Sequence, residues 1–273
     1  MSYKSIMVHL ELDRPDDSRI RIAANLAARF SGCLIGIAAA DPTPPAYGGG
    51  SVAGALIAQE RAKTLGQLTE AEKRFRVAVS GFSGPVEWRQ AFAKPNAYIA
   101  DQARAADLVT TGLSRGEEWI DPFHVLDPSA LVMEAGRPIL VVPSEVEDLQ
   151  AKCVLVAWKD TPEARRAIWA ALPLLQAADC VVVAQILEGQ EKSEAQHACE
   201  DVAKWLTRHG ATAVVRVVNG SDAALVLQEL ASDETADLLV FGAYGHSRLR
   251  EWVFGGVTRK LLTSSSLSCL LAH

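Results

Sequence analysis

The sequence lacks the marks of a disulfide-bonded, membrane-spanning or secreted protein. Its five cysteines form no C-x-x-C pair, and their odd number argues against a disulfide framework. The longest apolar runs, such as 139–143 and 237–241, are far shorter than the roughly 18 residues of a membrane-spanning helix. Residues 1–13 lack the basic, apolar and small-residue regions of a signal peptide. We therefore expect a cytoplasmic protein with no membrane partner.

A strong excess of charge is missing as well. The net charge is −6 over 273 residues, so we expect no general surface for nucleic acid or anionic membranes. Apolar residues make up 49% of the chain and charged residues 22%, which is ordinary for globular proteins and excludes a disordered chain. On a prior of roughly 150 residues per domain, the length predicts two domains.

The chain repeats itself. Residues 4–8 (KSIMV) are similar to 152–156 (KCVLV), and residues 106–109 (ADLV) are similar to 236–240 (ADLLV). Repeats of this kind indicate two copies of one structural unit. Each copy closes with a short apolar run, and the acidic stretch 144–150 joins them. We place the boundary there, with a first domain at 1–147 and a second at 148–273.

Short apolar runs alternate with helical segments in each half. Five runs of the second half, rich in Val, Ile and Leu, predict strands buried on both faces: 153–158, 180–187, 213–218, 238–241 and 267–272. Between them lie helix-start signals at Thr161 with Pro162, at Ser193 and at Ser221 with Asp222. The alternation predicts an α/β fold: two tandem, doubly wound, Rossmann-like domains with parallel sheets.

Ligands of such folds bind beyond the carboxyl ends of the strands, where the strand order reverses. After the fourth strand of the second half come Gly242, Gly245 and the pair Gly255-Gly256, which opens a helical segment. Glycines allow positive φ and close approach of backbone N–H groups to an anion, and a helix start favours phosphate. Residues 242–260 carry four basic side chains against one acid. Phosphate binding and ordinary turn glycines are both open interpretations here.

The equivalent loop of the first half differs in charge and in glycines. Residues 112–130 hold one basic side chain against four acids, and the helix start carries Asp127 and Pro128. Pro128 removes an N–H donor, and the acids repel a polyphosphate. We expect no nucleotide site at this loop.

The pattern Gly242-x2-Gly245-x9-Gly255 resembles the nucleotide loop of the universal stress protein family, and the match extends through Val257 and Thr258. The resemblance covers nearly the whole chain as two tandem copies. It implies a five-stranded parallel sheet in each copy and an adenine nucleotide (ATP, ADP or AMP, with or without Mg²⁺) whose phosphates lie on the glycine loop. His246 and Arg248 fall inside this loop, where His246 either touches a phosphate or is a solvated loop histidine.

Two departures from the family pattern concern ligand contacts. The Ser or Thr after the third glycine is Gly256 here, which removes a hydroxyl donor. The Asp at the end of the first strand is replaced by Lys159 in the second half and by Glu11 in the first, with Asp160 one position later. Asp160 either reaches the ribose or caps the following helix.

The leading hypothesis is a stress-response protein that senses or stores an adenine nucleotide through its second domain, with at most slow ATP hydrolysis. The alternative is a nucleotide-free scaffold with the same fold. We expect no catalytic residues and no metal site. The apolar last strands of the two copies should cover each other's edges in an intramolecular pseudo-dimer, because a bare hydrophobic edge invites aggregation. A homodimer of the whole chain is a further option.

Two other regions attract predictions. Residues 53–79 form a long helical segment in which Leu56, Leu65, Leu68 and Phe75 make an apolar stripe, for packing on the sheet or as a lid or partner surface. Trp169 and Trp205 sit at the spacing of helical core residues.

Overall fold

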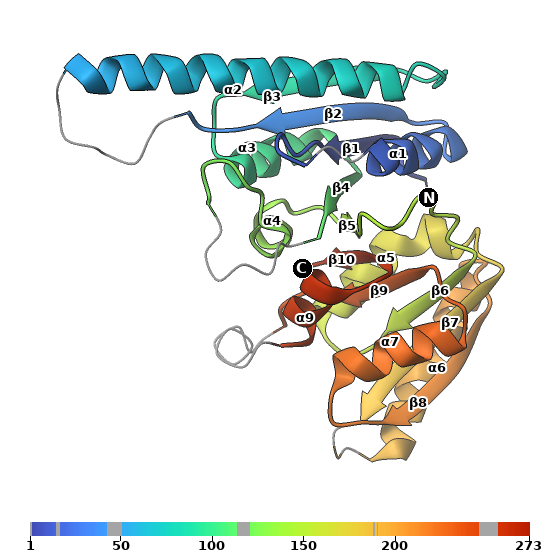
Figure 1. Cartoon of the computed structure of the whole chain (residues 1–273). Helices are drawn as coiled ribbons and strands as arrows, with labels where there is room; N and C mark the ends of the chain where they lie inside the picture. Colours follow the sequence, from blue (N-terminus) through green and yellow to red (C-terminus); the bar gives the residue numbers. More distant parts are fainter. Residues whose placement is uncertain are drawn as a thin grey trace. The chain divides into compact units, whose positions relative to one another are not determined.

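The structure is a computed structural model that describes residues 2–14, 17–42, 51–113, 121–187, 189, 191–245 and 256–273. The chain divides into two compact units, which we call the first unit (3–137) and the second unit (138–273). Each is an α/β unit in which strands and helices alternate along the chain (Figure 1).

The first unit has a four-stranded parallel sheet in the order β3-β2-β1-β4. Its elements are β1 (Ser5–His9), α1 (Asp17–Arg29), β2 (Cys33–Ala39), α2 (Ser51–Ala78), β3 (Val86–Ala91), α3 (Pro95–Gln102), the 3₁₀ turn η1 (Ala103–Ala105), β4 (Leu108–Gly112) and α4 (Pro128–Glu134). Strands β1 and β4 are buried almost throughout, as expected of central strands covered on both faces.

The second unit has a sheet in the order β5-β10-β9-β6-β7-β8. Its elements are β5 (Ile139–Val142), β6 (Cys153–Ala157), α5 (Pro162–Leu175), β7 (Cys180–Leu187), α6 (Lys192–Arg208), β8 (Ala213–Asn219), α7 (Ala223–Asp233), β9 (Leu238–Gly242), α9 (Val257–Ser264) and β10 (Ser268–Ala272). All neighbours are parallel except β5, which runs antiparallel to β10. The predicted α/β fold with parallel sheets is confirmed.

Strand β5 belongs to the first sequence repeat but to the second compact unit. It pairs with β10 with Val141 opposite Cys269 and Leu140 opposite Leu270, so the last strands of the two repeats do pair, as the sequence predicts. All four residues are fully buried. Because of this pairing the compact units divide at residues 137 and 138, whereas the division of the sequence into repeats at residue 147 stays a prediction.

The helices of the second unit lie on two faces of its sheet. Right-handed crossovers place α5 and α6 on one face and α7 and α9 on the other, because the strand order reverses after β8. Contacts agree: α5 packs on β9 and β10, α6 packs on β7 and β8, and α7 touches α9. Figure 1 shows α7 and α9 in front of the sheet and α5 and α6 behind it.

Two of the three predicted helix starts are correct. Thr161 caps α5 by accepting a hydrogen bond from the Ala164 N–H (3.3 Å), and Asp222 caps α7 by accepting from the Leu225 N–H (3.4 Å). The prediction at Ser193 is wrong, since α6 begins at Lys192 and its N-cap Glu191 makes no side-chain cap.

The predicted stripe on the long helix α2 is only half correct. Leu68 and Phe75 are fully buried, but Leu56 and Leu65 are 53% and 49% exposed. The buried face runs through Thr64, Leu68, Ala71 and Phe75 instead, at steps of three and four residues.

Candidate functional site

The carboxyl ends of β6 and β9 form the switch point of the second unit. These two strands are neighbours, with Val156 opposite Val240, while the chain leaves β6 toward β7 and leaves β9 toward β10. The loops that follow β6 and β9 therefore meet at one edge of the sheet, where ligands of parallel α/β folds bind. Strands β1 and β4 form the matching switch point of the first unit.

Gly242 ends β9 and packs against the start of α5. A Cβ at this position would lie 2.6 Å from the Glu163 carbonyl carbon and against the Ala164 backbone nitrogen. Backbone atoms cannot move aside as a side-chain tip can, so any side chain here would push α5 off the sheet. Gly242 is thus required for helix packing, a role that its place in the motif does not reveal.

Gly245 lies in a more open place. A Cβ on it would meet only the Glu163 carboxylate at 3.5 Å and the Thr161 methyl group at 3.8 Å, which are ordinary contacts. Positive φ was expected at the loop glycines, but the left-handed residue of the described loop is Tyr244, with φ of +52°. The fold therefore tolerates a side chain at 245, and its glycine leaves free the space beside Glu163.

Glu163 is a residue of the candidate site that sequence reasoning missed. It is only 6% exposed, it is the second residue of α5, and its carboxylate faces Gly245, with the Arg166 guanidinium 3.8 Å away. A carboxylate in the first turn of a helix is favoured by the helix dipole, so Glu163 just after Thr161-Pro162 was a readable signal. Its charge makes this side of the loop a hydrogen-bond acceptor.

Helix α9 follows the same loop in the chain. Its N-cap is Gly256, and no side chain of the described residues caps it. The side chains of the next two residues are buried to different degrees. Thr258 is 4% exposed and packs inside the unit, whereas Val257 is half-buried. An eight-residue helix with an uncapped start presents backbone donors and the positive end of its dipole.

The basic charge of this loop is partly neutralised from α7. The Lys260 ammonium lies 2.7 Å from the Asp222 carboxylate, an acid outside the loop. The hydrogen bond from Lys260 holds the pKa of Asp222 below its usual value, with help from the backbone N–H of Leu225. The excess of basic over acidic side chains in residues 242–260, four against one, therefore overstates the positive charge available to a ligand.

Asp160 does not cap α5, since the N-cap of that helix is Thr161. It pairs with Arg165 of α5, and both side chains are 59% exposed. Together they line a groove between α5 and α6 that also contains Trp158. Among the described residues, the ones beside Gly245 are Thr161 and Glu163. Of the other predicted site residues, His246, Arg248 and Gly255 lie outside the described residues.

The switch point of the first unit is filled by an internal ion pair. Arg19, the third residue of α1, is 5% exposed, and its guanidinium lies 3.1 Å from the Glu11 carboxylate. A Cβ on Gly112 would lie 2.7 Å from Glu11 Oε1 and 2.8 Å from Arg19 Cζ. Sequence analysis singled out Glu11 but missed Arg19, although Arg19 lies one turn before the buried Ala23 on the inner face of α1.

The helix start of the first unit is closed as well. Asp127 caps α4 by accepting a hydrogen bond from the Ser129 N–H (2.9 Å), and Pro128 supplies no donor. Asn96 holds this cap, donating to the Asp127 carbonyl and accepting from its N–H, both at 2.8 Å. Carboxylate and proline together leave no anion site here.

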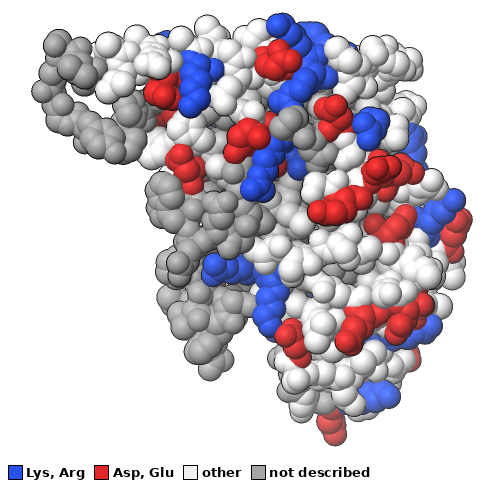
Figure 2. All heavy atoms as spheres, in the orientation of Figure 1, with Lys and Arg blue, Asp and Glu red and all other residues white. Residues whose placement is uncertain are grey.

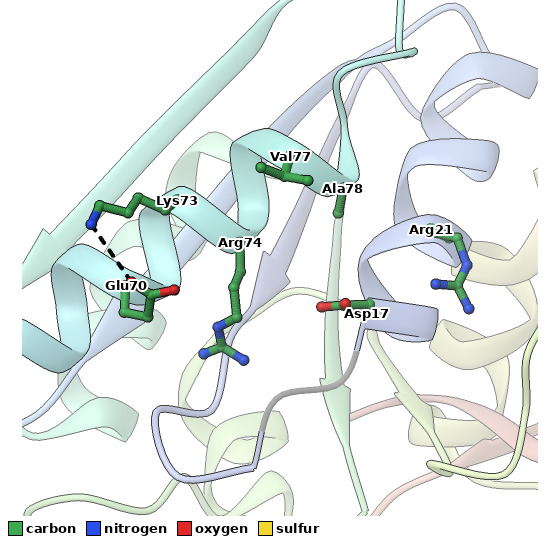
Figure 3. Close-up of a pocket in the computed structure, with 7 residues that line it drawn as sticks. All are labelled: Asp17, Arg21, Glu70, Lys73, Arg74, Val77 and Ala78. Carbon is green, nitrogen blue, oxygen red and sulfur yellow. Dashed lines mark ion pairs between the residues drawn. The ribbon is translucent and has the colours of Figure 1, made fainter.

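The surface offers a further cavity in the first unit, of about 240 Å³ between α1 and α2. Figure 3 shows Asp17 at the start of α1 and Arg74 on α2 beside it, with the Lys73–Glu70 ion pair at 3.7 Å on the outer side of α2. Acids and bases alternate here, as they do over the face drawn in Figure 2. The lining of this cavity therefore has no large excess of positive or negative side chains that would favour one class of ligand.

Two structural features are absent from the part of the chain that the structure describes. It contains no helix long and apolar enough to cross a membrane. It also contains no cluster of three or more His, Cys, Asp or Glu side chains arranged to hold a metal ion.

Residues 150–273 match the model of the universal stress protein family. The second repeat is a universal stress protein domain. The fold of such proteins extends over the whole chain: a universal stress protein from Archaeoglobus fulgidus DSM 4304 superposes with a TM-score of 0.74 at 12% identity, covering 98% of this chain and 95% of that one. The predicted family is therefore confirmed for residues 150–273, and the predicted fold is confirmed over both copies.

Other solved structures are similar over the whole chain or over about half of it. A functionally unknown protein from Pseudomonas aeruginosa PAO1 superposes with a TM-score of 0.58 at 16% identity, over 99% of this chain and 92% of that one. A universal stress protein in complex with cAMP covers 45% of this chain and 96% of its own length, at 25% identity and a TM-score of 0.38. No curated protein sequence matches the chain.

Proposed function

We propose that this protein is a cytoplasmic stress-response protein that binds one adenine nucleotide, in its second unit, as a sensor or store rather than as a fast catalyst. The observation that carries the proposal is the open start of α9. There the cap is a glycine and no side chain of the described residues bonds to the N–H groups, whereas Asp127 and Pro128 close the start of α4. Only an open helix start can donate its N–H groups to a phosphate.

Glu163 predicts how the nucleotide is oriented in the proposed site. A buried carboxylate repels phosphate but accepts hydrogen bonds from hydroxyl groups. The ribose hydroxyls would therefore lie toward Glu163 and Gly245, and the phosphates toward the start of α9. Gly242, Gly245 and Gly256 shape the loop between these two ends, and any Mg²⁺ would arrive with the phosphates.

A nucleotide-free scaffold is the second candidate. It is favoured by the acids at the site, since Glu163 faces the loop and Asp222 neutralises Lys260. The missing hydroxyl at Gly256 and the Asp160–Arg165 pair also favour it.

Titration calorimetry with ATP, ADP and AMP tests the proposal. We expect one site per chain, lost in Gly245→Val, because the added side chain occupies the space beside Glu163 while its Cβ makes only ordinary contacts. Circular dichroism and thermal melting of Gly245→Val check that the fold is retained. Leu225→Ala, an exposed change on α7, is the control and should bind normally. Two sites per chain, or binding that survives Gly245→Val, contradicts the proposal; no heat with any adenine nucleotide favours the scaffold.

A further inference from the structure

A groove of about 560 Å³ runs between α5 and α6 on one face of the second unit. Its volume lies within the usual range for small-molecule sites. The apolar part of its lining comes from both helices, and includes Ile168 on α5 and Ala198 and Val202 on α6. All lining residues lie within 158–205, away from the glycine loop.

Three of the six tryptophans of the chain line this groove: Trp158, Trp169 and Trp205. Trp158 follows β6 at one end, and its backbone N–H continues the sheet by donating to the Ala184 carbonyl at 2.7 Å. The rings of Trp169 and Trp205 lie 6.1 Å apart, each beside His209. Trp169 was expected in the core but is 48% exposed, which is costly for an indole that has no function on the surface.

The acids of the groove are both paired with bases. Asp160 pairs with Arg165, and the Asp201 carboxylate lies 3.4 Å from the Lys204 ammonium. The faces of indole rings carry negative potential, and tryptophan attracts cations more strongly than the other aromatic side chains. The indoles are therefore the groups of this groove that attract a cation with apolar substituents.

We propose that the groove between α5 and α6 binds an organic cation, a substituted ammonium group carried on an apolar body. The indoles contact the substituents and the charge together, while Asp201 balances the charge of Lys204 at the rim. A neutral molecule of the same shape gains only the apolar contact. Selectivity for charge at constant shape is therefore the property that distinguishes this site from a general apolar groove.

The test compares choline with 3,3-dimethylbutan-1-ol, which has the same shape and no charge. Binding to the full chain is followed through the indole N–H signals of ¹H–¹⁵N spectra, assigned by single Trp→Phe variants. We expect choline to shift the signals of Trp158, Trp169 and Trp205 and to bind about twofold to thirtyfold more tightly than the alcohol. The signal of Trp88, in the first unit, should not move.

Matched variants locate the contacts. Trp169→Leu should remove most of the selectivity for choline, whereas Trp169→Phe, which keeps an aromatic face, should retain part of it. Asp201→Asn should weaken choline binding up to about fivefold, and Asp233→Asn, an exposed acid on α7, should leave it unchanged. Equal binding of choline and the alcohol, shifts confined to other tryptophans, or no binding of choline would each overturn the proposal. Competition by ATP would place choline at the glycine loop and would overturn it too.

Discussion

The two units fill the space at their switch points in opposite ways. In each, the strand beside the first-helix start ends in a glycine, Gly112 of β4 or Gly242 of β9, and the start of that helix packs against the glycine. The third residue of that helix is Arg19 in the first unit and Ala164 in the second. A long cation fills the first switch point from inside, whereas a small residue at the second lets the backbone close in and leaves the loop beyond for a ligand.

The starts of the last helices differ in the same sense. Asp127 supplies an internal anion to α4, and Gly256 supplies nothing to α9. The first unit thus places its own cation, Arg19, at the switch point and its own anion, Asp127, at the start of its last helix. A fold copied twice can keep its architecture while one copy fills its switch point with its own side chains.

The largest expected effect concerns β5, the strand of the first repeat that pairs with β10 of the second repeat. A chain of residues 148–273 lacks β5 and exposes the apolar edge of β10, whereas a chain of residues 138–273 keeps the β5–β10 pair. We expect the shorter chain to aggregate or to pair with itself more strongly than the longer one, as measured by size-exclusion chromatography with light scattering. Equal behaviour of the two chains would show that β5 does not protect the edge.

Breaking the internal ion pair should give the next largest effect. Arg19→Ala leaves the Glu11 carboxylate part-buried without its guanidinium, and we expect a loss of about 3–5 kcal/mol in the free energy of unfolding. Arg21→Ala, an exposed arginine on the same helix, is the control and should change the stability by less than about 0.5 kcal/mol. Urea titrations followed by circular dichroism measure both. A small effect of Arg19→Ala would mean that water replaces the guanidinium at no cost.

The two end-of-strand glycines should respond unequally to the same substitution. Gly242→Ala forces the Cβ into the backbone of α5, and we expect a loss of about 3 kcal/mol; Gly112→Ala meets side-chain atoms of Arg19 and Glu11, which can shift, and should cost about 1 kcal/mol. Adenine nucleotide binding should survive Gly112→Ala, as calorimetry can check. The reverse order of stabilities would contradict this assignment of the contacts.

The smallest effects should come from the helix caps. Asp127→Ala removes the cap of α4 and should cost about 1 kcal/mol, while Gly256→Ser at the start of α9 should add only a few tenths of a kcal/mol in stability. The added hydroxyl can donate to a phosphate, so nucleotide affinity should rise about tenfold. Thermal melts with and without ATP separate the two contributions. An unchanged affinity in Gly256→Ser would place the phosphates elsewhere.

The fold could be predicted from sequence because central strands buried on both faces are continuous apolar runs. Strands β6, β7, β8, β9 and β10 lie within a residue of the predicted runs. The membership of β5 in the second unit could not be predicted to the residue, because an apolar run does not state which compact unit it joins. The stripe on α2 was partly wrong because Leu56 and Leu65 are apolar but lie off the buried face.

The candidate site was predictable only in its backbone. Glycine spacing identified the loop, and Asp127 with Pro128 identified the closed helix start. The charged residues that shape both switch points, Arg19 and Glu163, occupy buried positions that the usual rule assigns to apolar side chains. Asp160 was expected to reach the ribose or to cap the following helix; Thr161 makes that cap, and Asp160 pairs with Arg165 at the groove.

Strand β5 also affects how the chain can change over generations. A gene that lost its first repeat up to the boundary at residue 147 would lose the strand that covers β10. Selection on the second repeat therefore preserves the end of the first repeat. One four-residue strand, β5, must be kept for the sake of β10, whereas the rest of the first repeat can diverge in its chemistry.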